Sequence, residues 1–479
     1  MAEGFIQEDG SRSLKEIANG YLTDLVDRNL LIVEQWYALG DVSDCKVHDL
    51  VRQVCVEKGK EERFFLKIDS PPSNRLFSII RKQNKKLRNW KKVITTNKPR
   101  RVVTYQEINI KRLSPPPTPS VRSFVGLNRE TTIIHNISKF FHSFACRRVL
   151  NPEKFLCSFA LLRVLHLEKC ESNDFSPGLA LLVHLRFLQI WLSSFPPSIC
   201  NLWNLQTLWI KTLSSYMVLP SNISDLVNLR HLGSNADLYL PSIEGPMKLL
   251  EVISKVVLGD GVDNFQKCFP GIKELTSTLY SDKENDFEVL HYLQILILIG
   301  SGYSRRRSVE GEFVRGEPNL GKNHIIIRFP ATLKSLELER CGLPWSDMSI
   351  IQSLPNLEVL VIVDNGFEGT LWKTTGEEQF QQLKFLRLEK LNIKQWEASS
   401  INFPCLQQLQ VLNCIVLEEI PLELGDISTL EYIKVWNCGA SLLESLQKIR
   451  QEQDDAGNYE LKIFVDGRDM PSCEPNHDD

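Results

Sequence analysis

One pattern of apolar positions repeats along the C-terminal two thirds of the chain. Leucine or another aliphatic residue occupies its positions 1, 4 and 6, and cysteine or asparagine occupies position 9. The complete copies are Leu162–Cys170, Leu333–Cys341, Leu357–Asn365, Leu406–Cys414 and Leu430–Cys438. Looser copies begin at Leu185, Leu205, Leu229, Leu250, Ile272, Leu293 and Leu383. Neighbouring copies mostly start 20 to 26 residues apart.

This spacing predicts a leucine-rich-repeat solenoid. Positions 4 and 6 alternate with period two, as in a short strand that buries one face, and position 9 falls where the chain leaves the strand. A single repeat cannot bury its own apolar side. Stacked repeats form a parallel sheet on the concave side of a horseshoe, with the leucines as one continuous core. We therefore expect an α/β solenoid.

The side chains between the leucines are predicted to face outward and to form a protein-binding surface. Trp209, Arg387 and Lys434 occupy the position between two buried residues of a strand, and Trp191 and Trp436 come just after their strands. Tryptophan and arginine are common at binding hot spots. The alternative is that these side chains only pack against outward-facing neighbours, since scattered exposed apolar residues are normal.

The first 68 residues follow a different pattern. Apolar residues recur at helical spacing from Leu14 to Val26, with Ser11 and Ser13 as candidate N-caps. Leu30–Val33 reads as a short strand. A second helix is expected from near His48 to Cys55 or beyond, with a buried face that contains Leu50, Val51 and Val54. Helix, short strands and helix are typical of the C-terminal part of a winged-helix domain.

Four segments are expected along the chain. Residues 1–68 form the winged-helix part, 69–120 a basic linker leading into the solenoid, 121–466 the leucine-rich repeats, and 467–479 a disordered tail. The linker includes a strongly basic stretch from Arg75 to Arg112, which could bind acidic partners or simply be a solvated surface. The repeat is interrupted between Gly300 and Lys322, where we expect an inserted loop.

Composition narrows the class of protein. A net charge of -3 argues against a general nucleic-acid binder. Of 12 cysteines, four occupy position 9 of the repeat and the rest show no paired spacing, so reduced thiols are expected. The first residues lack a secretory signal pattern, and no apolar run is long enough for a transmembrane helix. We expect a cytoplasmic protein, with any membrane association made through partners.

No motif predicts a catalyst. Gly316–Asn323 has the glycine and lysine spacing of a phosphate loop, but Asn323 replaces the Ser or Thr that would bind magnesium, and a strand rather than a helix follows. Cys45, His48 and Cys55 could form part of a metal site, but no fourth ligand has suitable spacing. We expect no enzyme activity and no metal site.

Three N-terminal segments carry a resemblance to a known family. Lys46-Val-His-Asp-Leu-Val51 resembles the Met-His-Asp motif of plant intracellular immune receptors, with Val47 in place of methionine. Met1–Ile6 and Ser13–Leu30 resemble segments that precede this motif in the same winged-helix domain. Together with the repeats, the chain resembles the coiled-coil, nucleotide-binding, leucine-rich-repeat disease-resistance proteins, in the branch similar to late blight resistance proteins.

The resemblance implies roles for particular residues. His48 would sense the ADP phosphate and Asp49 would support the fold, unless His48 simply begins a helix without any ligand. The family's coiled coil, phosphate loop and the aspartate-bearing strand after that loop do not occur in this sequence, so it resembles an N-terminally truncated receptor. We expect no nucleotide to bind this chain alone, although the full-length family binds ADP or ATP.

The resemblance also implies partners. They would be a pathogen effector or a guarded host protein, and the nucleotide-binding domain of a full-length parent, with no nucleic acid. The leucine-rich repeats would recognise the effector and restrain the nucleotide switch. The alternative is a leucine-rich-repeat adaptor, such as a substrate-recognition subunit of a ubiquitin ligase. The winged-helix resemblance argues against it, because those adaptors carry an F-box-like module instead.

Overall fold

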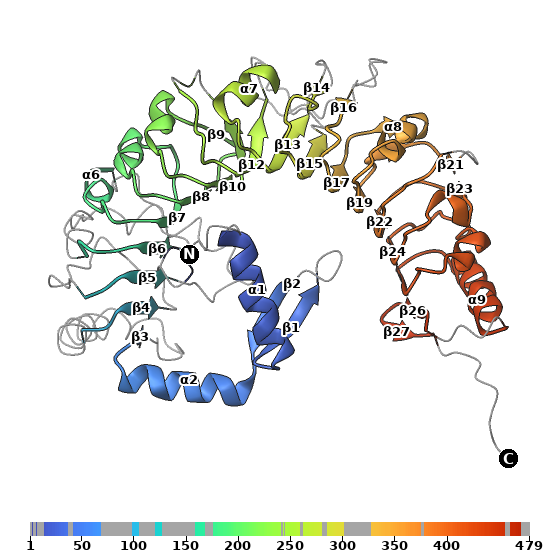
Figure 1. The fold of residues 1–479 in the computed structure, drawn as a ribbon, viewed down its shortest axis with the longest axis horizontal. Coiled ribbons are helices and arrows are strands. Elements are labelled where there is room, and N and C mark those ends of the chain that lie inside the picture. Colours follow the sequence, from blue (N-terminus) through green and yellow to red (C-terminus); the bar gives the residue numbers. More distant parts are fainter. Residues whose placement is uncertain are drawn as a thin grey trace, which may run out of the picture. The chain divides into compact units, whose positions relative to one another are not determined.

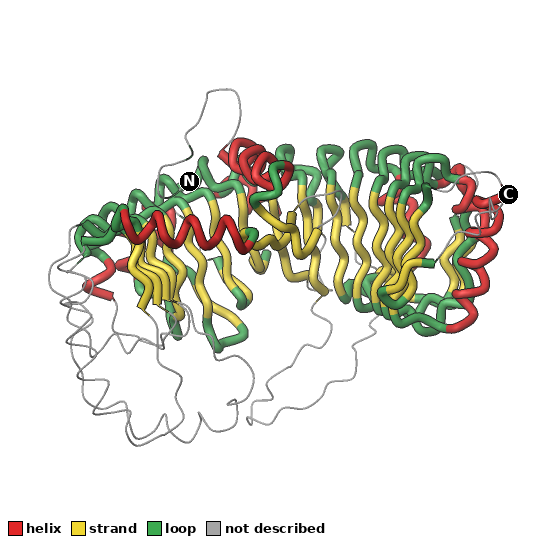
Figure 2. Tube along the Cα trace, turned by 90° about the horizontal axis from the view of Figure 1, so that it is seen from below, coloured by secondary structure: helices red, strands yellow, loops and turns green. Residues whose placement is uncertain are grey.

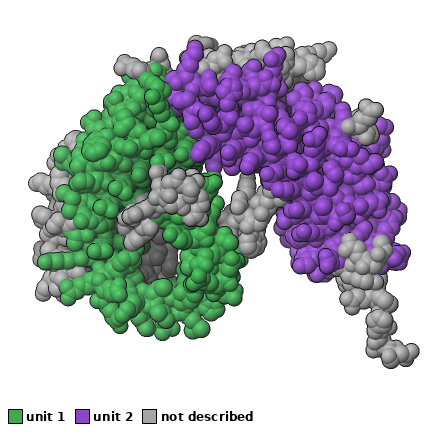
Figure 3. Space-filling model, in the orientation of Figure 1, with its two compact units in different colours: residues 1–36, 42–252 green, residues 37–41, 253–479 purple. Residues whose placement is uncertain are grey.

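The protein forms two compact units, shown in different colours in Figure 3. Unit 1 contains residues 1–36 and 42–252, and unit 2 contains residues 253–479 with 37–41. The computed structural model describes residues 14–36, 42–68, 98–104, 120–126, 159–167, 176–240, 245–258, 262–279, 285–300, 327–374, 378–455 and 460–470, with the isolated residues 2, 6 and 243. The unit boundary thus falls inside the segment predicted as one continuous repeat region.

Unit 1 begins with two helices and a hairpin, of which the N-terminal pattern predicts the helices and the first strand. The elements are α1 (Leu14–Asp27), β1 (Leu31–Trp36), β2 (Val42–Val47) and α2 (Asp49–Glu61). Helix α1 ends where Asn29 adopts a left-handed φ of 55°, and the N–H of Leu30 donates to the carbonyl of Leu25 at 2.9 Å. Strands β1 and β2 pair antiparallel, with Leu31 opposite Val47. The predicted N-caps of α1 lie outside the described residues.

The predicted buried face of α2 is wrong. Leu50 is 71% exposed and Val54 is 64% exposed, and Val51 is half-buried. Among the described elements, α2 packs mainly against β3 (Phe65–Ile68), through its C-terminal end, where Gly59 faces the ring of Phe65. Helical spacing identified an apolar stripe correctly. It could not tell whether this chain supplies the surface that covers it.

A parallel sheet follows in unit 1, built from one strand per turn. Its strands run in the order β3, β4 (Arg101–Thr104), β5 (Ser123–Gly126), β6 (Val164–Leu167), β7 (Phe187–Trp191), β8 (Thr207–Lys211) and β10 (His231–Ser234). Figure 1 shows them side by side. The sheet begins at Phe65, so the first turns lie before residue 121, where the sequence predicted the repeats to start. No leucine pattern marks β3 and β4.

Shorter elements complete the turns of unit 1. Strands β9 (Tyr216–Val218) and β11 (Asp237–Tyr239) pair parallel to each other. The connections also contain helix α6 (Ser176–Leu179) and the 3-10 turns Pro197–Asn201 and Ser221–Asp225.

Unit 2 has the same construction, and Figure 2 shows its strands as parallel rungs. The sheet contains β12 (Val252–Val257), β13 (Glu274–Leu279), β15 (Ile295–Gly300), β17 (Ser335–Glu339), β19 (Val359–Val363), β22 (Phe385–Glu389), β24 (Gln408–Leu412), β25 (Tyr432–Trp436), β26 (Lys462–Val465) and β27 (Arg468–Asp469). Strand β27 is antiparallel to β26. It lies at residues predicted as tail, and residues 471–479, like the loop at 301–326, are outside the described residues.

The remaining elements of unit 2 connect these strands. Three short parallel pairs are β14 (Asn285–Asp286) with β16 (Ile327–Arg328), β18 (Leu343–Pro344) with β20 (Phe367–Glu368), and β21 (Leu371–Lys373) with β23 (Gln395–Glu397). The helices are α7 (Val262–Cys268), α8 (Met348–Gln352) and α9 (Ala440–Asp455), with 3-10 turns at Trp345–Asp347, Ser400–Asn402 and Leu422–Asp426.

The leucines of the repeat form ladders through the core. In unit 2 the position-4 residues lie opposite one another in register and have no exposed surface: Leu336, Leu360, Leu386, Leu409 and Ile433. Position-6 residues form a second buried ladder beside them. The spacing therefore predicted the inward face of these strands correctly.

Position 9 links successive turns. The Cys341 thiol donates to the carbonyl of Leu298, and the Cys414 thiol to the carbonyl of Leu388, at 3.4 and 3.6 Å. Burial raises the pKa of both thiols to about 12, so they are protonated donors at neutral pH. The preceding residue adopts a left-handed φ, 53° at Arg340 and 55° at Asn413, which turns the chain out of the strand.

Three tryptophans from successive turns of unit 2 stack beside the core. The ring centroids of Trp345 and Trp372 are 4.9 Å apart, and those of Trp372 and Trp396 are 5.0 Å apart with an interplanar angle of 2°. Phe403 packs edge-on against Trp372 and Trp396. Each ring covers the next, so this stack extends the apolar core outside the leucine ladders.

We predict that Leu360→Ala lowers the free energy of unfolding by about 2–5 kcal/mol, because the residue is fully buried between two turns. Leu371→Ala is the matched control: its side chain is 43% exposed in the same unit, and we expect a loss of less than about 1 kcal/mol. Denaturant unfolding followed by circular dichroism measures both. Equal losses in the two variants would contradict the assigned register.

Candidate protein-recognition surface

His48 and Asp49 lie at the start of α2. His48 is the N-cap of α2. Its imidazole Nδ1 accepts a hydrogen bond from the backbone N–H of Leu50 at 3.3 Å, and the backbone N–H of His48 donates to the carbonyl of Leu30 at 3.2 Å. Accepting at Nδ1 leaves Nε2 as the protonated nitrogen of the neutral ring. Asp49 is exposed in the first turn of the helix, where its negative charge is stabilised by the positive end of the helix dipole. Both residues therefore have local structural roles.

Trp209, on β8, lies flat against the next turn. Its side chain is only half-buried, but its ring covers Gly233 of β10, the residue opposite it in the sheet. A Cβ added at Gly233 would collide with the six-membered part of that ring. Trp209 thus faces outward, as the alternation predicts. Its indole ring packs over Gly233, because a glycine has no side chain to occupy that space.

Other outward positions of unit 1 also contact one another along the stack. Gln189 Nε2 lies 2.9 Å from His166 Nε2 of the preceding turn. Trp191 is the last residue of β7, not beyond it, and lies opposite Lys211 of β8. Its indole N–H is buried without an acceptor among the described residues. The outward face of unit 1 is therefore a packed layer of mixed chemistry.

Arg387 lies at the centre of a charged and apolar face of unit 2. It is on β22 and forms an ion pair with Glu389 two residues further along the strand. Its Nε is buried and has no acceptor among the described residues. An apolar cluster lies on the same side of the strands: Val359, Val361, Phe385 and Val363.

Acidic side chains flank this cluster. Burial raises the pKa of the Glu337 carboxyl, and Glu339 and Glu389 raise it further while Arg387 opposes them. Arg340 pairs with Glu339 at 2.5 Å. The alternation of buried and outward residues predicts that Arg387 faces outward, but it does not show which outward residues meet across strands to form the cluster.

Lys434 and Trp436 occupy β25, close to the C-terminal end of unit 2. Lys434 lies between Gln410 and Phe464 on neighbouring strands. Trp436 is the last residue of its strand and is 46% exposed, and its ring edge lies near Gly467. Of the five predicted surface residues, the structure places Trp191 and Trp209 in unit 1, and Arg387, Lys434 and Trp436 in unit 2.

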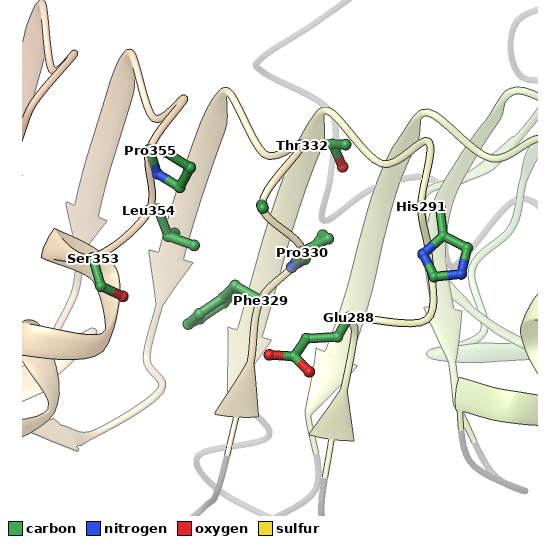
Figure 4. Close-up of a pocket in the computed structure, with 9 residues that line it drawn as sticks. Glu288, His291, Phe329, Pro330, Thr332, Ser353, Leu354 and Pro355 are labelled. Atoms are coloured by element: carbon green, nitrogen blue, oxygen red, sulfur yellow. The ribbon is translucent and has the colours of Figure 1, made fainter.

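An open hollow of about 440 Å³ lies on unit 2. Figure 4 shows the Glu288 carboxylate extending toward Phe329, with His291 on the other side. The hydroxyl of Thr332 donates a hydrogen bond to the carbonyl of Leu293 at 2.8 Å. The remaining lining is mostly aliphatic, and the Glu288 carboxylate points away from the His291 ring.

The part of the chain that the structure describes contains no group of three His, Cys, Asp or Glu side chains placed to hold a metal ion. The cysteines among the described residues are free thiols. They include Cys45 and Cys55, which the sequence suggested as possible metal ligands together with His48. None of the described helices has the length and apolarity needed to cross a bilayer. The near phosphate-loop pattern at 316–323 lies outside the described residues.

Comparisons with known proteins match both parts of the chain. Residues 1–55 match the disease resistance protein winged helix domain, and residues 137–296 match a leucine-rich repeat region. A late blight resistance protein of Solanum demissum is 28% identical over 97% of the chain, and a putative homologue from the same species is 30% identical over 97%. The chain is thus similar to disease-resistance proteins along nearly its whole length, with a winged helix domain followed by leucine-rich repeats.

The chain spans about a third of the length of these two relatives, 34% of the first and 33% of the second, but 59% of another putative Solanum demissum homologue. Among solved structures, the chain aligns with a leucine-rich-repeat protein of Leptospira interrogans. The alignment covers 74% of this chain and 89% of the Leptospira chain, with a TM-score of 0.34 and 15% sequence identity. The winged-helix match ends within α2, so it includes His48 and Asp49.

We predict that Gly233→Ala destabilises unit 1 by about 1–3 kcal/mol, because the new methyl group must displace the Trp209 ring. Gly245→Ala is the matched control, since its Cβ would meet nothing within 4 Å. Thermal unfolding measures the loss, and a red shift of tryptophan emission reports exposure of the ring. A variant as stable as the control would contradict the packing of Trp209 on Gly233.

Proposed function

We propose that this chain is the recognition and restraining part of an intracellular plant immune receptor. Its leucine-rich repeats bind a pathogen effector or a guarded host protein and restrain a nucleotide-binding switch in the defence response. The proposal is supported chiefly by one observation: a disease-resistance winged helix is followed by a repeat sheet whose outward positions carry aromatic, charged and aliphatic side chains.

The face around Arg387 has the chemistry of a protein-binding centre. Val359, Val361 and Phe385 provide an apolar middle, and charged residues on β17 and β22 form its rim. Protein interfaces commonly combine a dry apolar centre with a polar rim. The Arg387–Glu389 pair holds the guanidinium in place before a partner arrives, which lowers the conformational cost of binding.

Restraint of a switch requires a difference in affinity between two states. A surface that binds both an effector and the resting nucleotide-binding domain would link the two events, because each partner then competes for the same outward side chains. The exposed apolar residues Leu50 and Val54 on α2 support a further contact with the rest of a longer receptor. In this arrangement the chain supplies binding only, and we propose no catalytic step for it.

We also propose that the chain alone does not hold a nucleotide. A phosphate site uses several backbone amides together with lysine and magnesium, and His48 offers one imidazole whose Nδ1 already caps α2. Calorimetry with ADP should give no binding tighter than about 1 mM. Micromolar ADP binding that is lost in the His48→Ala variant would overturn this proposal. The control variant is His48→Asn, which retains a capping side chain and so separates loss of a nucleotide contact from loss of the helix cap.

The recognition surface can be tested in leaf tissue. The corresponding third of the late blight resistance protein would be replaced by this chain, and cell death measured with and without a matching effector. We expect Trp209→Ala together with Arg387→Ala to abolish the effector response or to cause cell death without effector. Trp203→Ala with Arg328→Ala is the matched control, because both residues are exposed away from the concave strands.

Protein levels must be equal in the compared leaves. Unchanged signalling in the Trp209 and Arg387 variant at normal abundance would contradict the proposed surface. The same loss in the control variant would also contradict it, because the effect would then not depend on the concave strands.

A further inference from the structure

Unit 1 carries four arginines at the same structural position in four successive turns. Each is the residue before the strand on that turn, and its backbone carbonyl accepts the backbone N–H of the next one. The N–H of Arg122 donates to Arg100 at 2.7 Å, that of Arg163 to Arg122 at 2.7 Å, and that of Arg186 to Arg163 at 2.8 Å. We call these residues the arginine column: Arg100, Arg122, Arg163 and Arg186.

The column is a compact line of positive charge. Neighbouring strands are about 4.8 Å apart, so the four Cα atoms span roughly 14 Å. Arg100 is exposed and the other three are half-buried. Arg122 Nη1 reaches the carbonyl of Leu161 at 3.4 Å. Within the described residues, no hydrogen bond or ion pair holds the side chain of Arg100 or Arg186.

The same position elsewhere in the chain carries mixed charges. Beyond Arg186 it continues in unit 1 as Gln206, Arg230 and Glu251, and Arg230 pairs with Glu251 at 3.2 Å. In unit 2 it is occupied by Lys273, Gln294, Lys334, Glu358, Lys384, Gln407 and Glu431. There Lys384 pairs with Glu358 at 2.9 Å. The fold therefore accepts uncharged or alternating residues at this position, and four consecutive arginines are not a requirement of the turn.

Charge repulsion within the column opposes folding. Like charges a few ångströms apart repel by up to about 1 kcal/mol per pair in water, and salt reduces this. The aliphatic stems can cover apolar surface, but lysine or glutamine would do so as well. What arginine adds is a planar fork of donors that binds carboxylates in pairs. The chemistry of the column therefore fits an acidic partner.

The spacing distinguishes between two forms of acidic partner. In an extended strand, side chains on one face recur about every 6.8 Å, so four of them span about 20 Å. On an α-helix, residues on one stripe recur about every 5.4 Å, so four of them span about 16 Å. The helix fits the 14 Å column more closely, with differences that long arginine side chains can absorb.

We infer that the arginine column binds a partner α-helix that carries glutamates or aspartates along one stripe, at spacings i, i+4, i+7 and i+11. The helix would lie along the line of the column, across the starts of the strands. Each carboxylate would accept hydrogen bonds from a guanidinium, and the four contacts together would fix the direction of the helix. This inference does not depend on the proposed recognition surface around Trp209 and Arg387.

The experiment uses the full chain and fluorescein-labelled alanine-rich helical peptides of about 18 residues. One peptide carries four glutamates on a single stripe, and the other has the same composition with the glutamates distributed around the helix. Fluorescence anisotropy gives the Kd of each at low and at moderate salt. We expect the striped peptide to bind at least about tenfold more tightly, with a salt dependence that reflects several ion pairs.

The variant Arg122→Gln/Arg186→Gln should weaken binding of the striped peptide at least about tenfold. Lys334→Gln/Lys384→Gln, at the same position in unit 2, is the matched control and should change the Kd less than about twofold. Arg122→Lys/Arg186→Lys should retain part of the affinity, which guards against a variant that simply misfolds, and thermal unfolding checks all three.

Three results would overturn the inference. Equal binding of the striped and distributed peptides would indicate general attraction to acidic molecules. Equal weakening by the unit 2 control would place the site elsewhere. In a competition assay, inositol hexakisphosphate could displace the labelled striped peptide at a lower concentration than the unlabelled striped peptide does. That result would assign the column to a compact phosphate ligand instead of a helix.

Discussion

The structure depends on the way each turn is fixed to the one before it. The carbonyl of the residue before a strand accepts two backbone N–H groups of the following turn, as Arg163 does from Arg186 and Phe187, or Lys334 from Glu358 and Val359. This contact sets the strand register, and a shift by one residue would turn every leucine outward. With the register fixed, the leucine ladders bury completely, and the position-9 thiols of Cys341 and Cys414 bond to the turns before them.

The same constraint leaves the outward positions free to vary, and the two units use that freedom differently. In unit 1 the outward layer is packed sideways, with Trp209 lying over Gly233. In unit 2 it contains the apolar cluster around Val361, bordered by Glu337 and Arg387. A solenoid that keeps its core spacing can therefore change its surface chemistry without changing its fold.

The sequence predicted the inward face well, because burial requires leucine at fixed short spacing. Helical spacing and a short apolar run also predicted α1, the strand β1 and the beginning of α2. It failed where the deciding contact is remote. The orientation of Trp209 depends on a glycine 24 residues further on, and the exposure of Leu50 depends on surfaces other than its own helix. The arginine column was missed because irregular loop lengths hide it: its members are 22, 41 and 23 residues apart and align only in the sheet.

The stack of Trp345, Trp372 and Trp396 has an optical consequence. Three parallel indoles about 5 Å apart share their electronic transitions, so their far- and near-ultraviolet circular dichroism differs from that of three separate tryptophans. Because each ring belongs to a different turn, this excitonic signal exists only while three neighbouring turns remain stacked. The chain thus contains a native chromophore that reports the integrity of one segment of unit 2, without a label and independently of the helices that dominate ordinary spectra.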